Sequence, residues 1–408
     1  MRVFRSMSFM HLWCRQLARA ETRNVVSTAV FNLFRGLATS GFNALFATYM
    51  SRLGYSLSEI GAVATLSNVL GASISPLVGY LLEVYSSRMI TALTGFMISA
   101  SLVIAAFSEN IITLAFSYAL FHLSMYFAQP ARMAFLARVV DKKRLGTVVG
   151  LTSSTFTASR AVGPVIGGFL VMSFGYMYAF STLAGIAVAG SLLFLACSHE
   201  PEPKKTEMLN RPSLADCYMR AIAPDRRLLL LYIFASLDRA AWNLWHPILG
   251  AYLLRQGYSE VSIGTLVSIS NVAETVGTPL AGKLVDKLGS STILAFSELT
   301  AAMAALTLMF PTATHLTTLS MLFIGISISF WIPGYNVYVA KVFKNVGETF
   351  ASVNAIRSIV SIPSPYLGGS LYDSMSSLAP FFLSAVMLTV ATVIASKNLK
   401  RVEALYER

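Results

Sequence analysis

The chain has 408 residues, of which 55% are hydrophobic and only 12% are charged. Soluble proteins carry about 25% charged residues, so this composition excludes an ordinary water-soluble protein and favours one embedded in a lipid bilayer. The formal net charge of +12 does not indicate nucleic-acid binding, because the basic residues follow a membrane topology.

Apolar runs long enough to cross a bilayer, which takes about 20 residues, recur along the whole chain. They predict an all-α membrane protein with twelve transmembrane helices at 25–50, 58–82, 88–107, 110–135, 146–172, 176–197, 227–252, 261–284, 290–311, 314–340, 348–372 and 377–396. The predicted domains are an amphipathic segment, a six-helix bundle, a polar linker, a second six-helix bundle and a tail, at 1–24, 25–197, 198–226, 227–396 and 397–408.

The distribution of basic residues predicts the orientation of these spans. Most of the 31 lysines and arginines lie at the two ends, in the central linker or in the loops that follow even-numbered spans, whereas Arg52 and Arg255 lie in the opposite loops. The positive-inside rule then places both termini in the cytoplasm. We expect a multi-pass plasma-membrane protein that is a monomer, with Cys14, Cys197 and Cys217 as free thiols on the cytoplasmic side.

The two halves of the chain repeat each other at an offset of 203 residues. Between 49–83 and 252–286, 14 of 35 aligned positions are identical, including Gly54-Tyr55-Ser56 against Gly257-Tyr258-Ser259. Each repeat holds six predicted spans. Two parallel six-span repeats are typical of carriers whose halves rock about a site near the middle of the bilayer.

A Gly-led motif with acidic and basic residues follows one predicted span in each repeat, as GKLVDKLGSS at 282–291 and in reduced form as GYLLEVYSSR at 79–88. With this loop motif the chain resembles the major facilitator superfamily along essentially its whole length. The resemblance implies a cytoplasmic gate in which acids at helix ends pair with bases leaving neighbouring spans; the residues are Gly79, Glu83, Arg88, Arg138, Gly282, Asp286, Lys287, Gly289 and Lys341.

The second motif, Gly-Pro-x-x-Gly-Gly, lies in the predicted fifth span and is associated with exporters in that family. Here it consists of Gly163, Pro164, Gly167 and Gly168, with Ser159 where the family pattern has a further glycine. Its glycines predict close helix packing, and Pro164 predicts a kink.

Charged residues occur deep within the predicted spans, where each costs about 2.5–3.5 kcal/mol on insertion scales. The cations are Arg35, Arg132, Arg160, Arg239 and Arg357, and the anions are Asp238, Glu274 and Glu298. The surplus of cations favours an anionic or carboxylate-bearing substrate, unless Arg132 extends to the membrane surface.

These charges have alternative roles. Arg35 and Asp238 form either an ion pair between the halves or part of a substrate or gating site, and Arg160 and Arg357 are candidate anion clamps. Asp238 and Glu274 are candidate proton carriers, with permanent salt bridging as the alternative. The predicted cavity residues are Asn32, Arg35, Asn43, Tyr126, Gln129, Arg160, Trp242, Asn243, His246, Trp331, Tyr335, Asn336 and Arg357.

The sequence therefore predicts a secondary active transporter that moves a small organic solute by alternating access, coupled to protons and with export favoured. Uptake or exchange of an organic anion is the alternative, and a transporter-like receptor or scaffold is a second alternative of another class. We expect no enzymatic activity, no metal and no cofactor; the expected partners are the solute, protons and the lipid bilayer.

Overall fold

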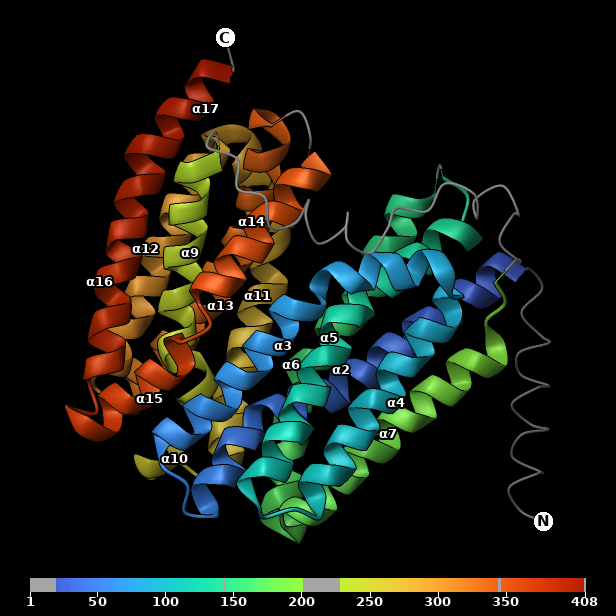
Figure 1. Cartoon of the computed structure of the whole chain (residues 1–408), viewed down its shortest axis with the longest axis horizontal. Helices are drawn as coiled ribbons and strands as arrows, with labels where there is room; N and C mark the ends of the chain where they lie inside the picture. Colours follow the sequence, from blue (N-terminus) through green and yellow to red (C-terminus); the bar gives the residue numbers. More distant parts are fainter. Residues whose placement is uncertain (1–19, 143, 201–227, 344–345, 407–408) are drawn as a thin grey trace. The chain divides into compact units, whose positions relative to one another are not determined.

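The computed structural model describes residues 20–142, 144–200, 228–343 and 346–406, and within these ranges every regular element is a helix. The helices of the first repeat are α2 (Ala20–Arg52), α3 (Leu57–Val84), α4 (Ser87–Ala106), α5 (Ile111–Val139), α6 (Leu145–Phe174) and α7 (Tyr176–Cys197). Figure 1 shows them in blue to green.

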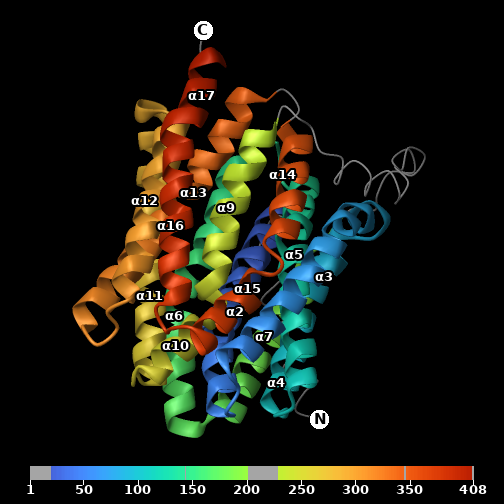
Figure 2. The same ribbon diagram turned by 60° about the vertical axis from the view of Figure 1, so that its left-hand side comes forward.

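The second repeat begins with α9 (Leu229–Trp245), η3 (His246–Ile248) and α10 (Leu249–Arg255). It continues with α11 (Glu260–Leu288), α12 (Ser290–Leu308), α13 (Thr314–Val342), α14 (Val346–Val360), α15 (Ser364–Ser374), α16 (Ala379–Val393), η4 (Ile394–Leu399) and α17 (Lys400–Tyr406). Helices α12 and α16 lie side by side in Figures 1 and 2 and contact each other.

Seven of the described helical segments are long and apolar enough to cross a membrane: Ser87–Ala106, Ile111–Val139, Leu145–Phe174, Tyr176–Cys197, Ser290–Leu308, Thr314–Val342 and Ala379–Leu405. The protein is thus an all-helical, multi-pass membrane protein. The count of twelve spans stays a prediction.

Two of the predicted spans are interrupted in the structure. The span expected at 227–252 consists of α9, the short η3 turn with Pro247 near its start, and α10. The span expected at 348–372 divides into α14 and α15 around residues 361–363. Proline lacks a backbone N–H and clashes with the preceding helical turn, so Pro247 and Pro363 account for breaks within apolar runs that otherwise read as continuous.

By their contacts, the described helices form two units. Unit 1 contains α2 as far as Phe42, α3 from Ile74, and α4–α7, while unit 2 contains residues 43–73 and α9–α17. The domain boundaries expected from the sequence stay a prediction.

Cys197 is disulfide-bonded. This finding corrects the expectation of three free thiols. The linear sequence could not show it, because a disulfide depends on two sulfur atoms lying close together in space.

The repeat has the same backbone geometry in both copies of the turn that follows the first span. Gly54 and Gly257 have φ angles of 92° and 91°, a left-handed conformation that costs glycine little. In each copy the next serine then accepts a hydrogen bond at the start of a helix, from the Glu59 amide to Ser56 Oγ and from the Ser262 amide to Ser259 Oγ, both at 3.2 Å.

Glycines at helix crossings bring backbones into contact in both units. A Cβ atom added at Gly163, in the fifth-span motif, would meet the Leu37 carbonyl and Ser40 of α2. In unit 2, a Cβ at Gly368 of α15 would meet the Leu244 carbonyl of α9. Small residues hold membrane helices together in this way because association depends on close van der Waals packing.

Candidate functional site

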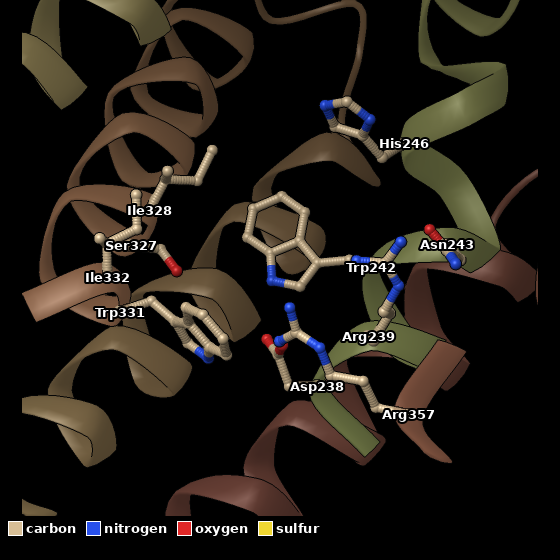
Figure 3. Close-up of a pocket in the computed structure, with 10 residues that line it drawn as sticks. All are labelled: Asp238, Arg239, Trp242, Asn243, His246, Ser327, Ile328, Trp331, Ile332 and Arg357. Carbon is tan, nitrogen blue, oxygen red and sulfur yellow. The ribbon is translucent and has the colours of Figure 1, made fainter. Parts of the chain in front are cut away.

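A cavity of about 260 Å³ lies within unit 2. Residues from α9, η3, α13 and α14 line it, namely Asp238, Arg239, Trp242, Asn243, His246, Ser327, Ile328, Trp331, Ile332 and Arg357 (Figure 3). Aromatic walls with a few polar groups are typical of small-molecule sites. Six residues that the sequence analysis selected as site residues thus meet here. Ser327 and Ile328 also line the cavity but were not selected; they precede Trp331 by one helical turn and lie on the same helical face.

The charged centre of the cavity combines one carboxylate with two arginines. The Asp238 carboxylate is buried, and the positive charges of Arg357 and Arg239 act on it. The Arg357 guanidinium carbon lies 4.8 Å from the centroid of the Trp331 ring, and Trp331 stacks on Tyr335 at 4.6 Å. Figure 3 shows the Trp242 ring in the middle of the cavity, beside Asp238 and Arg357.

Some donors in the cavity wall have no hydrogen-bond acceptor within the part of the chain that the structure describes. They include the side-chain nitrogen of Asn243 and the Nε atom of Arg239. A buried donor left unsatisfied costs about 1–3 kcal/mol, so both groups are suited to bind acceptor atoms of a ligand or of water.

Glu298 lies on α12, close enough to Asp238 for their negative charges to repel. It is 0% exposed, and the Trp331 side chain of α13 acts on it as a hydrogen-bond donor. The equivalent position of the first repeat, 203 residues earlier, is Gly95. The buried acid is therefore specific to the second repeat.

The second candidate proton carrier, Glu274, is also buried but lies outside the residues that line the cavity. It is on α11, where its backbone nitrogen lies against Gly325 of α13. Ser270, Asn271 and Glu274 are all buried, as expected for residues on one helical face.

Unit 1 contains three arginines that act on one another, and we call Arg35, Arg132 and Arg160 the arginine cluster. The charges of Arg132 on α5 and Arg160 on α6 both act on Arg35 of α2. The guanidinium carbons of Arg35 and Arg160 lie 4.7 and 5.9 Å from the centroid of the Phe156 ring. The pairing of Arg35 with Asp238 between the halves stays a prediction.

The remaining expected cavity residues lie elsewhere in the two units. Asn32 is fully buried and donates a hydrogen bond to the Thr152 carbonyl at 2.7 Å, so it connects α2 with α6. Tyr126 is half-buried, whereas Asn43, Gln129 and Asn336 are exposed. Their contribution to a cavity stays a prediction.

The expected gate residues of unit 1 surround a carboxylate that the sequence reading did not select. Glu200, just after α7, accepts hydrogen bonds from Ser86 Oγ at 2.6 Å, Ser87 Oγ at 2.5 Å and the Arg88 amide at 2.7 Å. It also forms an ion pair with Arg138 at 2.8 Å. Glu200 therefore caps the start of α4 and connects it to the end of α5.

Unit 2 contains the same arrangement 203 residues later. Glu403 accepts from the Ser290 and Ser291 amides, both at 2.9 Å, and from Ser290 Oγ at 2.5 Å. Glu200 and Glu403 lie at the repeat offset, as do Ser87 and Ser290, and this correspondence is the sequence signal that would have found them. We call the two arrangements the carboxylate clamps.

The other residues of the gate motif differ in their surroundings. Gly289 has a φ angle of 83° at the start of α12, whereas Ser86, its counterpart, has a φ of −59° and needs no glycine. Gly282 has open space beside it, and Asp286 and Lys287 are exposed. Latches between Glu83 or Asp286 and the bases Arg138 or Lys341 stay a prediction; the surroundings of Gly79 and the side chain of Glu83 are outside the described part.

The fold and the polar cavity define a helical membrane transporter. The family model of the Major Facilitator Superfamily matches residues 28–365. The chain belongs to the major facilitator superfamily.

Similar proteins of this class include a curated bacterial relative and solved transporter structures. The multidrug resistance protein MdtG of Escherichia coli (strain SMS-3-5 / SECEC) is 23% identical over 404 residues, with 95% of each chain covered. The nucleoside transporter NupG has a TM-score of 0.71 at 15% identity, covering 94% of this chain and 99% of that one. A variant of the peptide transporter POT in complex with sulfate has a TM-score of 0.75 at 13% identity, covering 93% and 95%.

Proposed function

We propose that the protein exports a small organic solute by alternating access and couples this export to protons. The observation that carries the proposal is the cavity of unit 2, in which Asp238 and Arg357 lie among Trp242 and Trp331. The unsatisfied donors of Asn243 and Arg239 provide hydrogen bonds to the solute, while the rings of Trp242 and Trp331 provide apolar contact.

The coupling is proposed from the position of Asp238. Its carboxylate lines the cavity and faces the charge of Arg357, so a proton on Asp238 changes the net charge at the cavity wall. A solute in the cavity and a proton on Asp238 then influence each other's binding, as linkage requires. Glu274 is the second candidate for this role.

Export rather than uptake is supported by two observations. The fifth-span motif, in which Gly163 lies against the α2 backbone, is the one associated with exporters in this family. The relative MdtG is named a multidrug resistance protein. Uptake or exchange of an organic anion is the second candidate, supported by the arginine cluster of unit 1.

Proton movement in proteoliposomes that contain a pH-sensitive dye tests the proposal. The purified protein is supplied with pooled anionic, cationic and neutral metabolites, alongside Asp238→Asn and Glu274→Gln, with exposed Glu109→Gln as the matched control. We expect solute-dependent proton flux that Glu109→Gln retains and that at least one of the other two variants loses. Solute movement without proton movement would refute coupling, and no movement of any solute would refute transport.

A further inference from the structure

Asp238 of α9 and Glu298 of α12 occupy matching positions between two apolar clusters of unit 2. Each cluster contains an alanine from both helices, one helical turn before the acids in the first cluster and one turn after them in the second. These alanines are Ala235 and Ala295 in the first, and Ala241 and Ala301 in the second. Residues three positions apart share a helical face, so the two acids form a polar layer between apolar ones.

The first repeat builds the corresponding part of its bundle without an acid on the third span. Ala92 lies in an apolar cluster of unit 1, as Ala295 does in unit 2, and the two are related by the 203-residue offset. One turn further along, unit 1 has Gly95 where unit 2 has Glu298. The packing of this region therefore does not require a carboxyl group. Because burying one costs free energy, its presence in unit 2 calls for a function.

Both carboxyl groups are removed from water and act on each other. Asp238 is 6% exposed and Glu298 is 0% exposed, and their negative charges repel. Arg357 and Arg239 act on Asp238, whereas Glu298 forms no ion pair within the described chain. Two neighbouring buried acids are more stable with one proton between them than with two full charges.

Trp331 of α13 connects Glu298 to the cavity. Its indole N–H acts on Glu298 as a hydrogen-bond donor, and its ring lines the cavity, with the Arg357 guanidinium carbon 4.8 Å from the ring centroid. Asp238 lines the same cavity (Figure 3). A solute in the cavity therefore meets Asp238 directly and acts on Glu298 through Trp331.

The other ionisable groups near the two acids come from α9, α13 and α14. They are Tyr232, Arg239, Tyr335, Tyr338 and Arg357. Helix α16 contacts both α9 and α12 and carries no ionisable residue. On α11 and α17, which also contact α12, the buried ionisable groups among the described side chains are Glu274 and Glu403, and Glu403 is held at the start of α12. Tyrosine and arginine keep their protons at neutral pH, so the two acids are the groups of this layer that can exchange one.

We propose that Asp238 and Glu298 hold one proton between them and that Glu298 is a second proton-coupling residue of the transporter. The proton passes between a carboxyl oxygen of Asp238 and one of Glu298, so one O–H bond breaks as the other forms and the pair keeps one negative charge. Solute binding at Trp331 and Arg357 shifts the proton to Asp238, from which it leaves through the cavity. The proposal rests on the proton-coupled transport proposed above and names the second acid of that site.

Infrared spectroscopy of the purified protein in lipid nanodiscs tests the pair without any solute. The C=O stretching band of protonated carboxyl groups is followed from about pH 4 to about pH 10. The contribution of Glu298 is the part of the band that Glu298→Gln removes, measured once in the wild type and once in Asp238→Asn. We expect its midpoint to differ between these two backgrounds by about one pH unit or more, because coupled groups titrate as a pair. Glu109→Gln, which removes an exposed acid of unit 1, should leave the midpoint unchanged.

A further variant tests the connection to the cavity. Trp331→Phe keeps an aromatic ring but removes the donor to Glu298, so it should also move the midpoint of the Glu298 contribution. An unchanged midpoint in Trp331→Phe would overturn the role of Trp331 in the coupling.

The outcomes separate the pair from transport itself. Equal midpoints with and without the Asp238 carboxyl, in samples with the wild-type size-exclusion profile, would overturn the shared proton, as would the absence of any titrating Glu298 contribution. A coupled titration without solute movement in proteoliposomes would keep the pair and overturn transport. Solute-dependent proton flux in Glu298→Gln equal to that of the wild type would overturn the coupling role of Glu298 and leave the proposed transport intact.

Discussion

Replacing Glu200 by glutamine tests whether the carboxylate clamp of unit 1 stabilises the fold. The side chain is 4% exposed and accepts four hydrogen bonds, from Ser86, Ser87, the Arg88 amide and Arg138. A hydrogen bond to a charged group contributes about 1.5–3 kcal/mol and a neutral one about 0.5–1.5 kcal/mol. After discounting the partly exposed Arg138, we expect Glu200→Gln to lower the free energy of unfolding by about 2–3 kcal/mol.

The same reasoning predicts a dependence on pH. Burial alone would raise the pKa of Glu200, but the hydrogen bonds from Ser86, Ser87, Arg88 and Arg138 outweigh it and lower the pKa below the usual value. Because the pKa is lower in the folded state, the stabilisation is fully present at pH values above the pKa of a glutamate in the unfolded chain, which is about 4.3. The stabilisation is lost as the pH falls through the pKa of Glu200 in the folded state.

Equilibrium unfolding in mixed micelles, followed by circular dichroism, measures both effects. The matched control is Glu21→Gln, because Glu21 is an acid of unit 1 in an exposed ion pair with Arg144 and should cost less than about 1 kcal/mol. If Glu200→Gln and Glu21→Gln lower the free energy of unfolding by the same amount at pH 7, the reasoning is refuted. A loss of stability in Glu200→Gln that stays the same from pH 7 down to the acid unfolding of the wild type would refute the role of the ionised carboxylate.

Other predictions use the same unfolding measurement. Gly368→Ala places a methyl group against the Leu244 carbonyl and should cost about 1–3 kcal/mol; a stability equal to that of Gly185→Ala, which has open space, would contradict this. Glu298→Gln keeps an acceptor for Trp331 and removes the charge that Asp238 repels, so it should leave the free energy of unfolding unchanged or raise it; a clear decrease would contradict this. Arg52→Gln should change stability by less than about 1 kcal/mol, since Arg52 is 56% exposed; a larger loss would show that the Glu260 pair is essential.

The sequence alone determined the class of protein, because span length and repeat offset are properties of the linear chain. Apolar runs of sufficient length indicate a membrane protein, and the 203-residue offset indicates an internal duplication. The two copies share the turn geometry of Gly54 and Gly257. The same offset relates Glu200 to Glu403. Their role as clamps was missed because each acts on a helix start more than 100 residues earlier in the chain.

The tertiary structure decided which intramembrane charges meet. Asp238 and Arg357, on α9 and α14, are separated by more than 100 residues, yet they share one cavity. The depth of a residue along a span follows from helix rise, but its neighbours depend on helix rotation and on glycine contacts such as Gly163 against α2. The sequence alone therefore shows that the predicted spans contain more arginines than acids. Only helix packing determines that Arg132 lies close enough to Arg35 for their charges to act on each other.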